Sequence, residues 1–211
     1  KKAASTIVTN LTPHGLINII PQWLNYSEKI SKEYMAHSIN IISLVSIHRT
    51  KEISCFLPRM ISIVLNTLRD SSDNLVKFAE NSLRNFVSLI STKELIPHKG
   101  LIIATLKNLS QRAPEFLQIF NNIKFSHYID AALFSLLMPI FVSGLNNNNS
   151  SSTKILSLNI ICSISFLVKQ CQLRIMSSDF VDKLKTLAFD SIPQVREKSA
   201  IALGTILKYC D

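Results

Sequence analysis

The sequence has few charged residues and few glycines, and it lacks the short motifs on which many catalytic sites are built. Only 18% of its 211 residues are charged, whereas 47% are hydrophobic; charged residues usually make up about a quarter of a soluble domain. The four glycines are isolated, so no glycine-rich loop is present to hold a phosphate group. We therefore expect a large apolar core and no nucleotide site of the glycine-rich kind.

Cysteine and histidine form no metal-ligand pattern. The cysteines are scattered singly among apolar residues without a CxxC pair, which predicts reduced core thiols rather than a disulfide framework. None of the histidines lies beside a carboxylate or a cysteine at the spacing of metal ligands. No local signature unites a nucleophile with its base. We expect no enzyme activity, no cofactor, no metal and no small-molecule substrate. The four cysteines are Cys55, Cys162, Cys171 and Cys210.

The apolar runs are too short to cross a membrane. The runs at 131–145 and 155–168 fall below the roughly 20 residues that a spanning helix needs, and the first contains Pro139. No N-terminal run has the three regions of a signal peptide. We expect a cytoplasmic protein that makes no membrane contact.

The sequence is rich in apolar residues at helical spacing. Leu57, Ile61, Val64 and Leu68 illustrate this period, which outweighs the strand preference of the many Ile and Val residues. Polar clusters and prolines divide the pattern into antiparallel helix pairs. The expected pairs are 13–26 with 31–47, 51–69 with 73–90, 93–109 with 112–127, 131–145 with 152–170, and 177–189 with 193–209.

The length of these pairs predicts the fold class. A repeat of about 40 residues is typical of HEAT and armadillo arrays. We expect an all-α, superhelical HEAT-repeat solenoid of about five helix pairs, forming a single array over residues 1–211. Residues 1–10 would be the trailing helix of an earlier pair. Because the chain starts at Lys1 and stops at Asp211 directly after a helical pattern, we expect a fragment of a larger solenoid protein.

A proline recurs in the leading helices. We expect each one to lie early in its helix and to bend it by removing a backbone hydrogen bond. These prolines are Pro21, Pro58, Pro97 and Pro139.

A cation recurs near the start of each trailing helix. Stacked pairs would align these cations along one edge, and the net charge of +9 favours polyanionic partners such as RNA or an acidic protein surface. The alternative is a solvated edge without a partner. The candidate polyanion-binding residues are Lys32, Lys77, Arg112, Lys154 and Arg196.

Three further features have competing interpretations. Asp190 and Arg196 have the spacing of a carboxylate–guanidinium bond across a turn, which favours a structural role for this pair. Trp23, Tyr26 and Tyr34 could stack on bases, but we interpret them as core or groove residues. The polar run from 146 to 152 predicts a mobile surface loop.

Two segments resemble a known family. They are FSHYIDAALFSLLMPIFVSGL at 125–145 and DSIPQVREKSAIALGTIL at 190–207, and the opening AASTIVTNLTPHGLINIIPQWL at 3–24 resembles the stretch before them. All three are similar to the HEAT region of the giant ribosome-associated activator of the general amino-acid control kinase, in its part similar to fungal translation elongation factor three. The family tends to carry arginine-containing sequence after Gly-Leu, where this chain has neutral asparagines from Asn146.

The resemblance implies a scaffold in translational control. Its implied partners are the ribosome, through ribosomal RNA or proteins, a protein kinase that acts on an initiation factor in the amino-acid starvation response, and an ATP-binding cassette protein. One alternative is the HEAT portion of an elongation factor-like ATPase. Another is a nuclear transport or adaptor solenoid that binds proteins in its groove.

Overall fold

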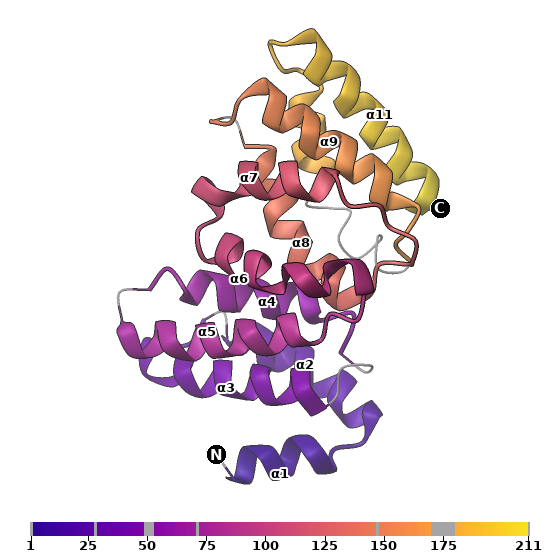
Figure 1. The fold of residues 1–211 in the computed structure, drawn as a ribbon. Helices are drawn as coiled ribbons and strands as arrows, with labels where there is room; N and C mark the ends of the chain where they lie inside the picture. The colour runs from indigo at the N-terminus through magenta and orange to yellow at the C-terminus, as the bar shows by residue number, and fades with distance from the viewer. Residues whose placement is uncertain are drawn as a thin grey trace. The chain divides into compact units, whose positions relative to one another are not determined.

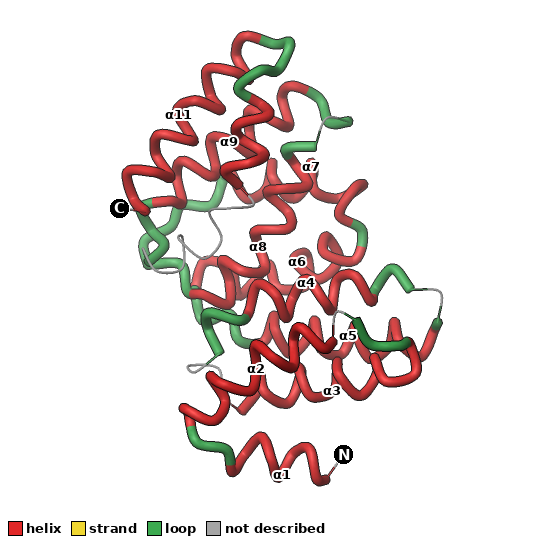
Figure 2. Tube along the Cα trace, turned by 180° about the vertical axis from the view of Figure 1, so that it is seen from behind, coloured by secondary structure: helices red, strands yellow, loops and turns green. Residues whose placement is uncertain are grey.

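The protein is a stack of paired helices in the part of the chain that the structure describes. The computed structural model describes residues 2–27, 29–48, 53–70, 72–146, 148–169 and 180–210, with the side chains of all of these except 2–5, 32, 33 and 210. Within these ranges every regular element is a helix, apart from an isolated bridge between Ile129 and Val168 (Figures 1 and 2). The expected all-α helical-repeat class is confirmed.

The chain divides into two compact units, 1–90 and 91–211, and each is described by itself. Whether they form the single array expected from the sequence stays a prediction. Unit 1 contains α1 (Lys2–Asn10), α2 (Pro13–Ser27), α3 (Lys32–His48), α4 (Leu57–Thr67) and α5 (Asp73–Ser88). Unit 2 contains η1 (Lys93–His98), α6 (Lys99–Lys107), α7 (Leu109–Asn121), α8 (Ala131–Gly144), α9 (Ser151–Ser165), a helical segment at 180–187, and α11 (Pro193–Cys210).

Three of the expected helix pairs pack together, namely α4 with α5, α6 with α7 and α8 with α9. In unit 1, α2 and α4 lead and α3 and α5 trail; α1 lies beside α3, as expected of a trailing helix (Figure 1). In unit 2 the trailing helices are α7, α9 and α11, and α9 packs against both of its neighbours. The leading helices α6 and α8 also contact each other. Consecutive trailing helices therefore run parallel within each unit.

Several predicted boundaries are wrong. The helix expected over 51–69 begins at Leu57, and the helix expected over 112–127 spans Leu109–Asn121. The helix expected over 93–109 begins as the 3-10 helix η1, which contains Pro97, and only Asn108 separates α6 from α7. Proline lacks the N–H that an α-helix interior would use, which favours the tighter turn here. The helix expected to end at 170 ends at Ser165, because the residues after it turn to pair with Ile129.

The prolines do not share one position. Pro58 is in the first turn of α4, where the missing N–H would have had no helical partner, so no hydrogen bond is lost there. Pro21 and Pro139 instead lie well inside α2 and α8. The expected early position is therefore correct for Pro58 and wrong for Pro21 and Pro139.

Helix α8 forms the core of unit 2. It carries no charged residue and is buried almost all round, as a helix without a polar face must be. Phe141 on α8 packs edge-on against Phe120 of α7 with ring centroids 5.5 Å apart, and Phe120 also contacts Phe116 and Phe125. Burying one such phenylalanine contributes about 1.5–3 kcal/mol. This uncharged central helix contributes to the low fraction of charged residues in the sequence.

Buried serines join two of the trailing helices of unit 2, α9 and α11, to their leading helices. The Ser157 hydroxyl on α9 donates to the Phe141 carbonyl at 3.0 Å, and the Ser199 hydroxyl on α11 donates to the Leu184 carbonyl at 2.6 Å. Both serines are fully buried, and each is the seventh residue of its helix. A small hydroxyl at this point lets two backbones approach closely while its own polar atom stays paired.

Consecutive trailing helices keep a nearly constant register. In unit 1, the Ser82 hydroxyl on α5 donates to the carbonyl of Ile39 on α3, which is 43 residues earlier in the chain. In unit 2, the Cys162 thiol on α9 interacts with the Thr205 side chain on α11, which has the same separation. The actual repeat is thus slightly longer than the roughly 40 residues inferred from the sequence.

Replacing Gly144 by alanine should destabilise unit 2. An added Cβ would lie 2.6 Å from Leu117 Cδ1 and 3.1 Å from Ser157 Oγ, so the buried side chains around α8 would have to move. We expect a loss of about 1–3 kcal/mol in urea unfolding. Gly204→Ala is the matched control, because a Cβ there meets nothing within 4 Å and should add about 0.5–1 kcal/mol. Equal stability of the two variants would contradict this packing.

Candidate functional site

The five predicted cations have different surroundings. Lys77 is exposed on α5 in unit 1, whereas the side chain of Lys32 lies outside the described part of the chain. Arg112, Lys154 and Arg196 lie in the first turns of the parallel helices α7, α9 and α11, and so share one edge of unit 2. We call this edge, where the trailing helices begin, the start edge.

Lys154 is a structural residue and not part of an exposed cation row. Its Nζ lies 2.8 Å from Asp190 Oδ2, and both side chains are only 9% exposed. The ammonium of Lys154 and, secondly, the backbone N–H of Ile192 hold the pKa of Asp190 below its ordinary value. Because both charges are taken up by this buried pair, the prediction that Lys154 is available to a polyanion is wrong.

Arg196 does not pair with the Asp190 carboxylate, contrary to the bond expected from their spacing. Its Nη1 instead donates to the backbone carbonyls of Asp190 at 2.8 Å and Ser191 at 3.0 Å. Lys154, from the preceding pair, occupies the carboxylate, so the guanidinium takes the carbonyls of the turn after the 180–187 helix. Cations suit such carbonyls at a helix C-terminus. The structural role expected for Arg196 holds with a different partner.

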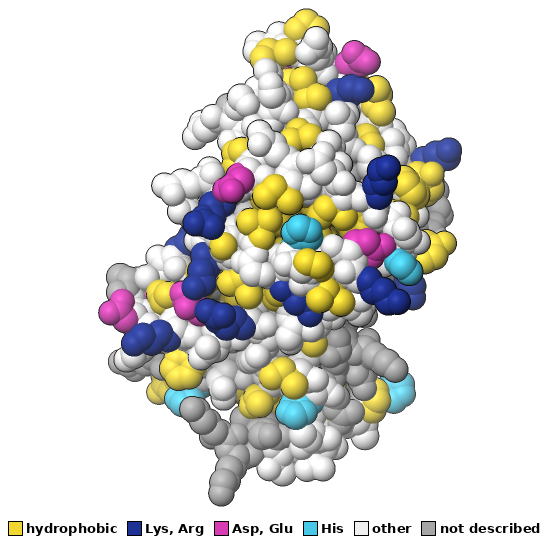
Figure 3. All heavy atoms as spheres, viewed as in Figure 1, with side chains coloured by type: hydrophobic (Ala, Val, Ile, Leu, Met, Phe, Trp, Pro, Cys, Tyr) yellow, Lys and Arg dark blue, Asp and Glu magenta, His cyan; other side chains and the backbone are white. Residues whose placement is uncertain are grey.

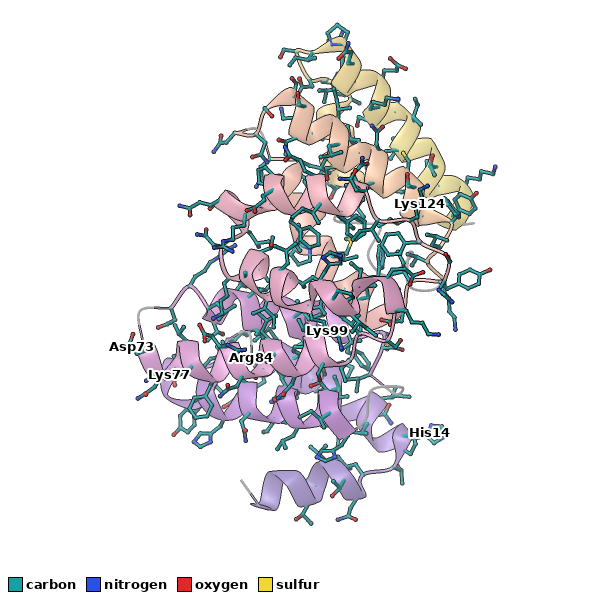
Figure 4. All side chains as sticks on the ribbon, viewed as in Figure 1. His14, Asp73, Lys77, Arg84, Lys99 and Lys124 are labelled. Carbon is teal, nitrogen blue, oxygen red and sulfur yellow. The ribbon has the colours of Figure 1, made fainter. Side chains whose placement is uncertain are left out.

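Exposed cations remain on α5 and at the start of α7. Lys77 and Arg84 lie seven residues apart, so they share the exposed face of α5 (Figure 4). The side chains of Lys77, Arg84 and Arg112 on α7 have no hydrogen bond or ion pair with a described residue. Lysine and arginine side chains are visible over α5 in the space-filling view (Figure 3). Lys77 and Arg84 are therefore candidate anion contacts in unit 1, and Arg112 is one in unit 2.

Several smaller predictions are wrong. Tyr26 and Tyr34 are exposed, so their interpretation as core residues is wrong, while their interpretation as groove residues stays a prediction; Trp23 is half-buried. Cys55 is exposed, not a core thiol, and Cys162 is half-buried. Cys171 and the side chain of Cys210 lie outside the described part of the chain.

The asparagine tract has a structural function that the sequence reading missed. Asn149 Nδ2 donates to the carbonyls of Ser143 at 2.7 Å and Gly144 at 3.1 Å, at the end of α8 where carbonyls lack helical partners.

A carboxylate cluster that sequence reasoning missed anchors the loop before α8. Glu94 Oε1 accepts the Ser126 N–H at 2.9 Å and lies 2.8 Å from Nδ1 of His127. These contacts, the one with His127 first, lower the pKa of Glu94 to about 2. Asp130 caps α8 by accepting the Leu133 N–H at 2.7 Å, and its second oxygen accepts the Ser91 hydroxyl at 2.8 Å.

This cluster ties the loop at 122–130 to the residues just before and within η1. Part of it falls in the His-Tyr-Ile-Asp motif at 127–130, which carries the family resemblance. The residues that made the motif distinctive therefore have a structural explanation, namely the cap of α8 and the anchor to Glu94.

Neither a metal cluster nor a membrane span is found in the described ranges. No three His, Cys, Asp or Glu side chains gather there as a metal site would require. None of the helices in those ranges combines the length and the apolar character needed to cross a bilayer.

The chain matches one group of curated proteins along almost all of its length. It is 28% identical over 205 residues to the stalled ribosome sensor GCN1 of Mus musculus, and the identity to that of Homo sapiens is the same. Each match covers 97% of this chain. It is also 21% identical over 207 residues to the eIF-2-alpha kinase activator GCN1 of Saccharomyces cerevisiae. The chain is thus similar to one stretch of the GCN1 proteins. This confirms the family resemblance drawn from 125–145 and 190–207.

The chain spans only 8% of the length of these GCN1 relatives. A shorter match joins 49% of the chain to elongation factor 3 of Mycosarcoma maydis at 20% identity. No family model matches the chain. Among solved structures, an engineered protein covers 98% of this chain with 12% identity and a TM-score of 0.35, a value too low to support an argument.

Breaking the Lys154–Asp190 pair should destabilise unit 2. In Lys154→Met the carboxylate of Asp190 keeps its burial but loses its charged partner, which should cost about 1–3 kcal/mol in urea unfolding at neutral pH. Arg112→Met, at the exposed start of α7, is the control and should change stability by less than about 0.5 kcal/mol.

The pair also predicts how this loss depends on pH. In the folded state the pKa of Asp190 lies below its ordinary value of 3.8. The carboxylate therefore contributes to the free energy of unfolding above pH 3.8, and this contribution is lost as the pH falls through the lowered pKa. The difference between Lys154→Met and the unmodified chain should therefore narrow in acid. A difference that is absent at neutral pH would show that the pair contributes no stability.

Proposed function

We propose that this chain is a non-catalytic segment of a cytoplasmic scaffold that binds ribosomes and helps to activate an initiation-factor kinase in the starvation response. The observation that carries this proposal is the match to GCN1 proteins over 97% of the chain. Those relatives are named for sensing stalled ribosomes and for activating the eIF-2-alpha kinase. The proposal transfers to this segment a role that belongs to much longer proteins.

The physical support for ribosome binding is the available positive charge. The chain has a net charge of +9, and Lys77, Arg84 and Arg112 are exposed without a partner in the described ranges. Such side chains bind phosphates by releasing counterions, which makes the affinity fall steeply with salt. Stacked helix pairs also present long surfaces on which proteins can dock. The kinase and an ATP-binding cassette protein are the protein partners that we propose for such surfaces.

A second candidate is the helical-repeat portion of an elongation factor-like ATPase. The similarity to elongation factor 3 favours it, but that match covers 49% of the chain against 97% for the GCN1 relatives. In both cases the segment itself would bind a translating ribosome and catalyse no reaction.

Co-sedimentation with purified ribosomes over a salt series tests the proposal. We expect saturable binding at low salt that weakens steeply as salt rises. Lys77→Glu combined with Arg84→Glu should weaken binding at least several-fold and reduce the slope of log affinity against log salt by about one to two units. These residues are exposed and unpaired, so the variant should stay folded, which circular dichroism would check.

The charge-matched control is Lys183→Glu combined with Lys185→Glu. It makes the same change of net charge on the 180–187 helix, where Lys185 already pairs with Asp182 at 3.6 Å and Lys183 with Asn146 at 3.3 Å. Equal weakening by the two variants would indicate attraction by net charge alone and would remove α5 from the site. Absence of binding by the folded chain at low salt would reject ribosome binding by this segment.

A further inference from the structure

Exposed aromatic side chains and lysines gather where the trailing helices of unit 2 end. We call this the end edge; it is opposite the start edge because α7, α9 and α11 run parallel. The aromatic residues are Tyr128, Phe166 and Tyr209, which are 73%, 54% and 38% exposed. The exposed lysines beside them in sequence are Lys124, Lys169 and Lys208. The sequence reading assigned no function to any of these six residues.

The backbone fixes Tyr128 and Lys169 on one surface. The Ile129 N–H donates to the Leu167 carbonyl at 2.9 Å, and Ile129 forms a parallel bridge with Val168. Ile129 and Val168 are both buried. Since side chains alternate along extended backbone, the neighbours of this buried pair must point outward. Tyr128, from the loop before α8, therefore shares an outer face with Lys169, from the end of α9.

The helix register places Phe166 and Tyr209 at equivalent positions. Cys162 on α9 interacts with Thr205 on α11, and one helical turn further along each helix lie Phe166 and Tyr209. Helices α9 and α11 run side by side in the ribbon view and in the tube view (Figures 1 and 2). Axes of packed helices are about 8–10 Å apart, so the two rings lie on neighbouring turns of one edge.

The exposed lysines of this edge have no acidic partner among the described residues. Lys124, labelled in Figure 4 beyond the end of α7, and Lys169 have no hydrogen bond or ion pair with a described residue. Lys208 Nζ lies 5.7 Å from the centre of the Tyr209 ring. The carboxylates of Glu94 in η1 and Asp130 in the adjoining loop accept the hydrogen bonds that anchor this loop, and neither of them pairs with these lysines.

We infer that the end edge of unit 2 binds unpaired RNA, with bases stacked on Tyr128, Phe166 and Tyr209 and phosphates held by the lysines. Alternating cations and exposed rings suit single strands, because the faces of unpaired bases are free to stack, whereas those in a duplex are already covered. A purely acidic protein surface would leave the three rings without a matching partner. The inference rests on the proposed function, in which the ribosome is the partner, and names unpaired RNA as what this edge contacts.

Fluorescence anisotropy with a labelled 12-nucleotide oligouridine tests the inference on the whole chain. We expect saturable binding to the single strand and weaker binding to a blunt RNA duplex of the same length. Tyr128→Ala and Phe166→Ala should each weaken binding to the single strand about tenfold, while Tyr128→Phe keeps the ring and most of the affinity. Lys124→Gln and Lys169→Gln should each reduce the salt slope by about 0.7.

Tyr26→Ala and Phe189→Ala are the controls, since both remove an exposed ring elsewhere on the chain and should leave the affinity unchanged. Equal affinity for duplex and single strand, or no effect of the Tyr128 and Phe166 variants, would overturn the inference. Competition by polyglutamate as effective as that by unlabelled RNA would also overturn it, in favour of an acidic protein partner.

The same variants separate this inference from the proposed function. Ribosome co-sedimentation that persists in a chain unable to bind oligouridine would reject the RNA edge and leave the scaffold proposal intact. Oligouridine binding without ribosome binding would support the edge and reject ribosome binding by this segment.

Discussion

The parallel packing of successive trailing helices decides where the side chains of each unit can act. In unit 1 this packing joins Ser82 to Ile39, and in unit 2 it joins Thr205 to Cys162, with the same separation of 43 residues. Parallel helices in constant register bring equivalent ends to one edge. Each unit therefore has an edge where trailing helices begin and another where they end, and residues that are distant in sequence meet there.

The two edges of unit 2 use their cations in opposite ways. At the start edge, Lys154 neutralises Asp190, and Arg196 binds backbone carbonyls, so these charges stabilise the fold. At the end edge, Lys124 and Lys169 have no such partners among the residues that the structure describes, and exposed rings lie beside them in sequence. Whether a cation serves the fold or a ligand thus depends on whether the neighbouring turn supplies a carboxylate or a carbonyl.

The helix pairs could be predicted from the sequence because a helical period is local. Residues such as Leu57, Ile61 and Val64 mark one buried face without reference to the rest of the chain. The state of Lys154 could not be predicted in this way, because it depends on Asp190, 36 residues away and in the next helix pair. The aromatic edge is not predictable for the same reason: Tyr128 and Lys169 share a face through the bridge between Ile129 and Val168, which joins segments 39 residues apart in the chain.

The exposed tyrosines mark a second limit of sequence reading. The helical pattern predicts that Tyr26 and Tyr34 lie in the core or in a groove, and their exposure excludes the core. Periodicity shows which face of a helix is apolar, but the neighbouring helices decide how much of that face is covered.

Disulfide trapping measures the register between α9 and α11 most directly. In a chain whose other cysteines are replaced by serine, Thr205→Cys should form an intramolecular disulfide with Cys162 under mild oxidation, because α9 and α11 pack together in the register that places Cys162 beside Thr205. Leu207→Cys, which places the thiol on the exposed face of α11, should not. Trapping at 207 in place of 205 would contradict the register, and with it the end edge on which the RNA inference depends.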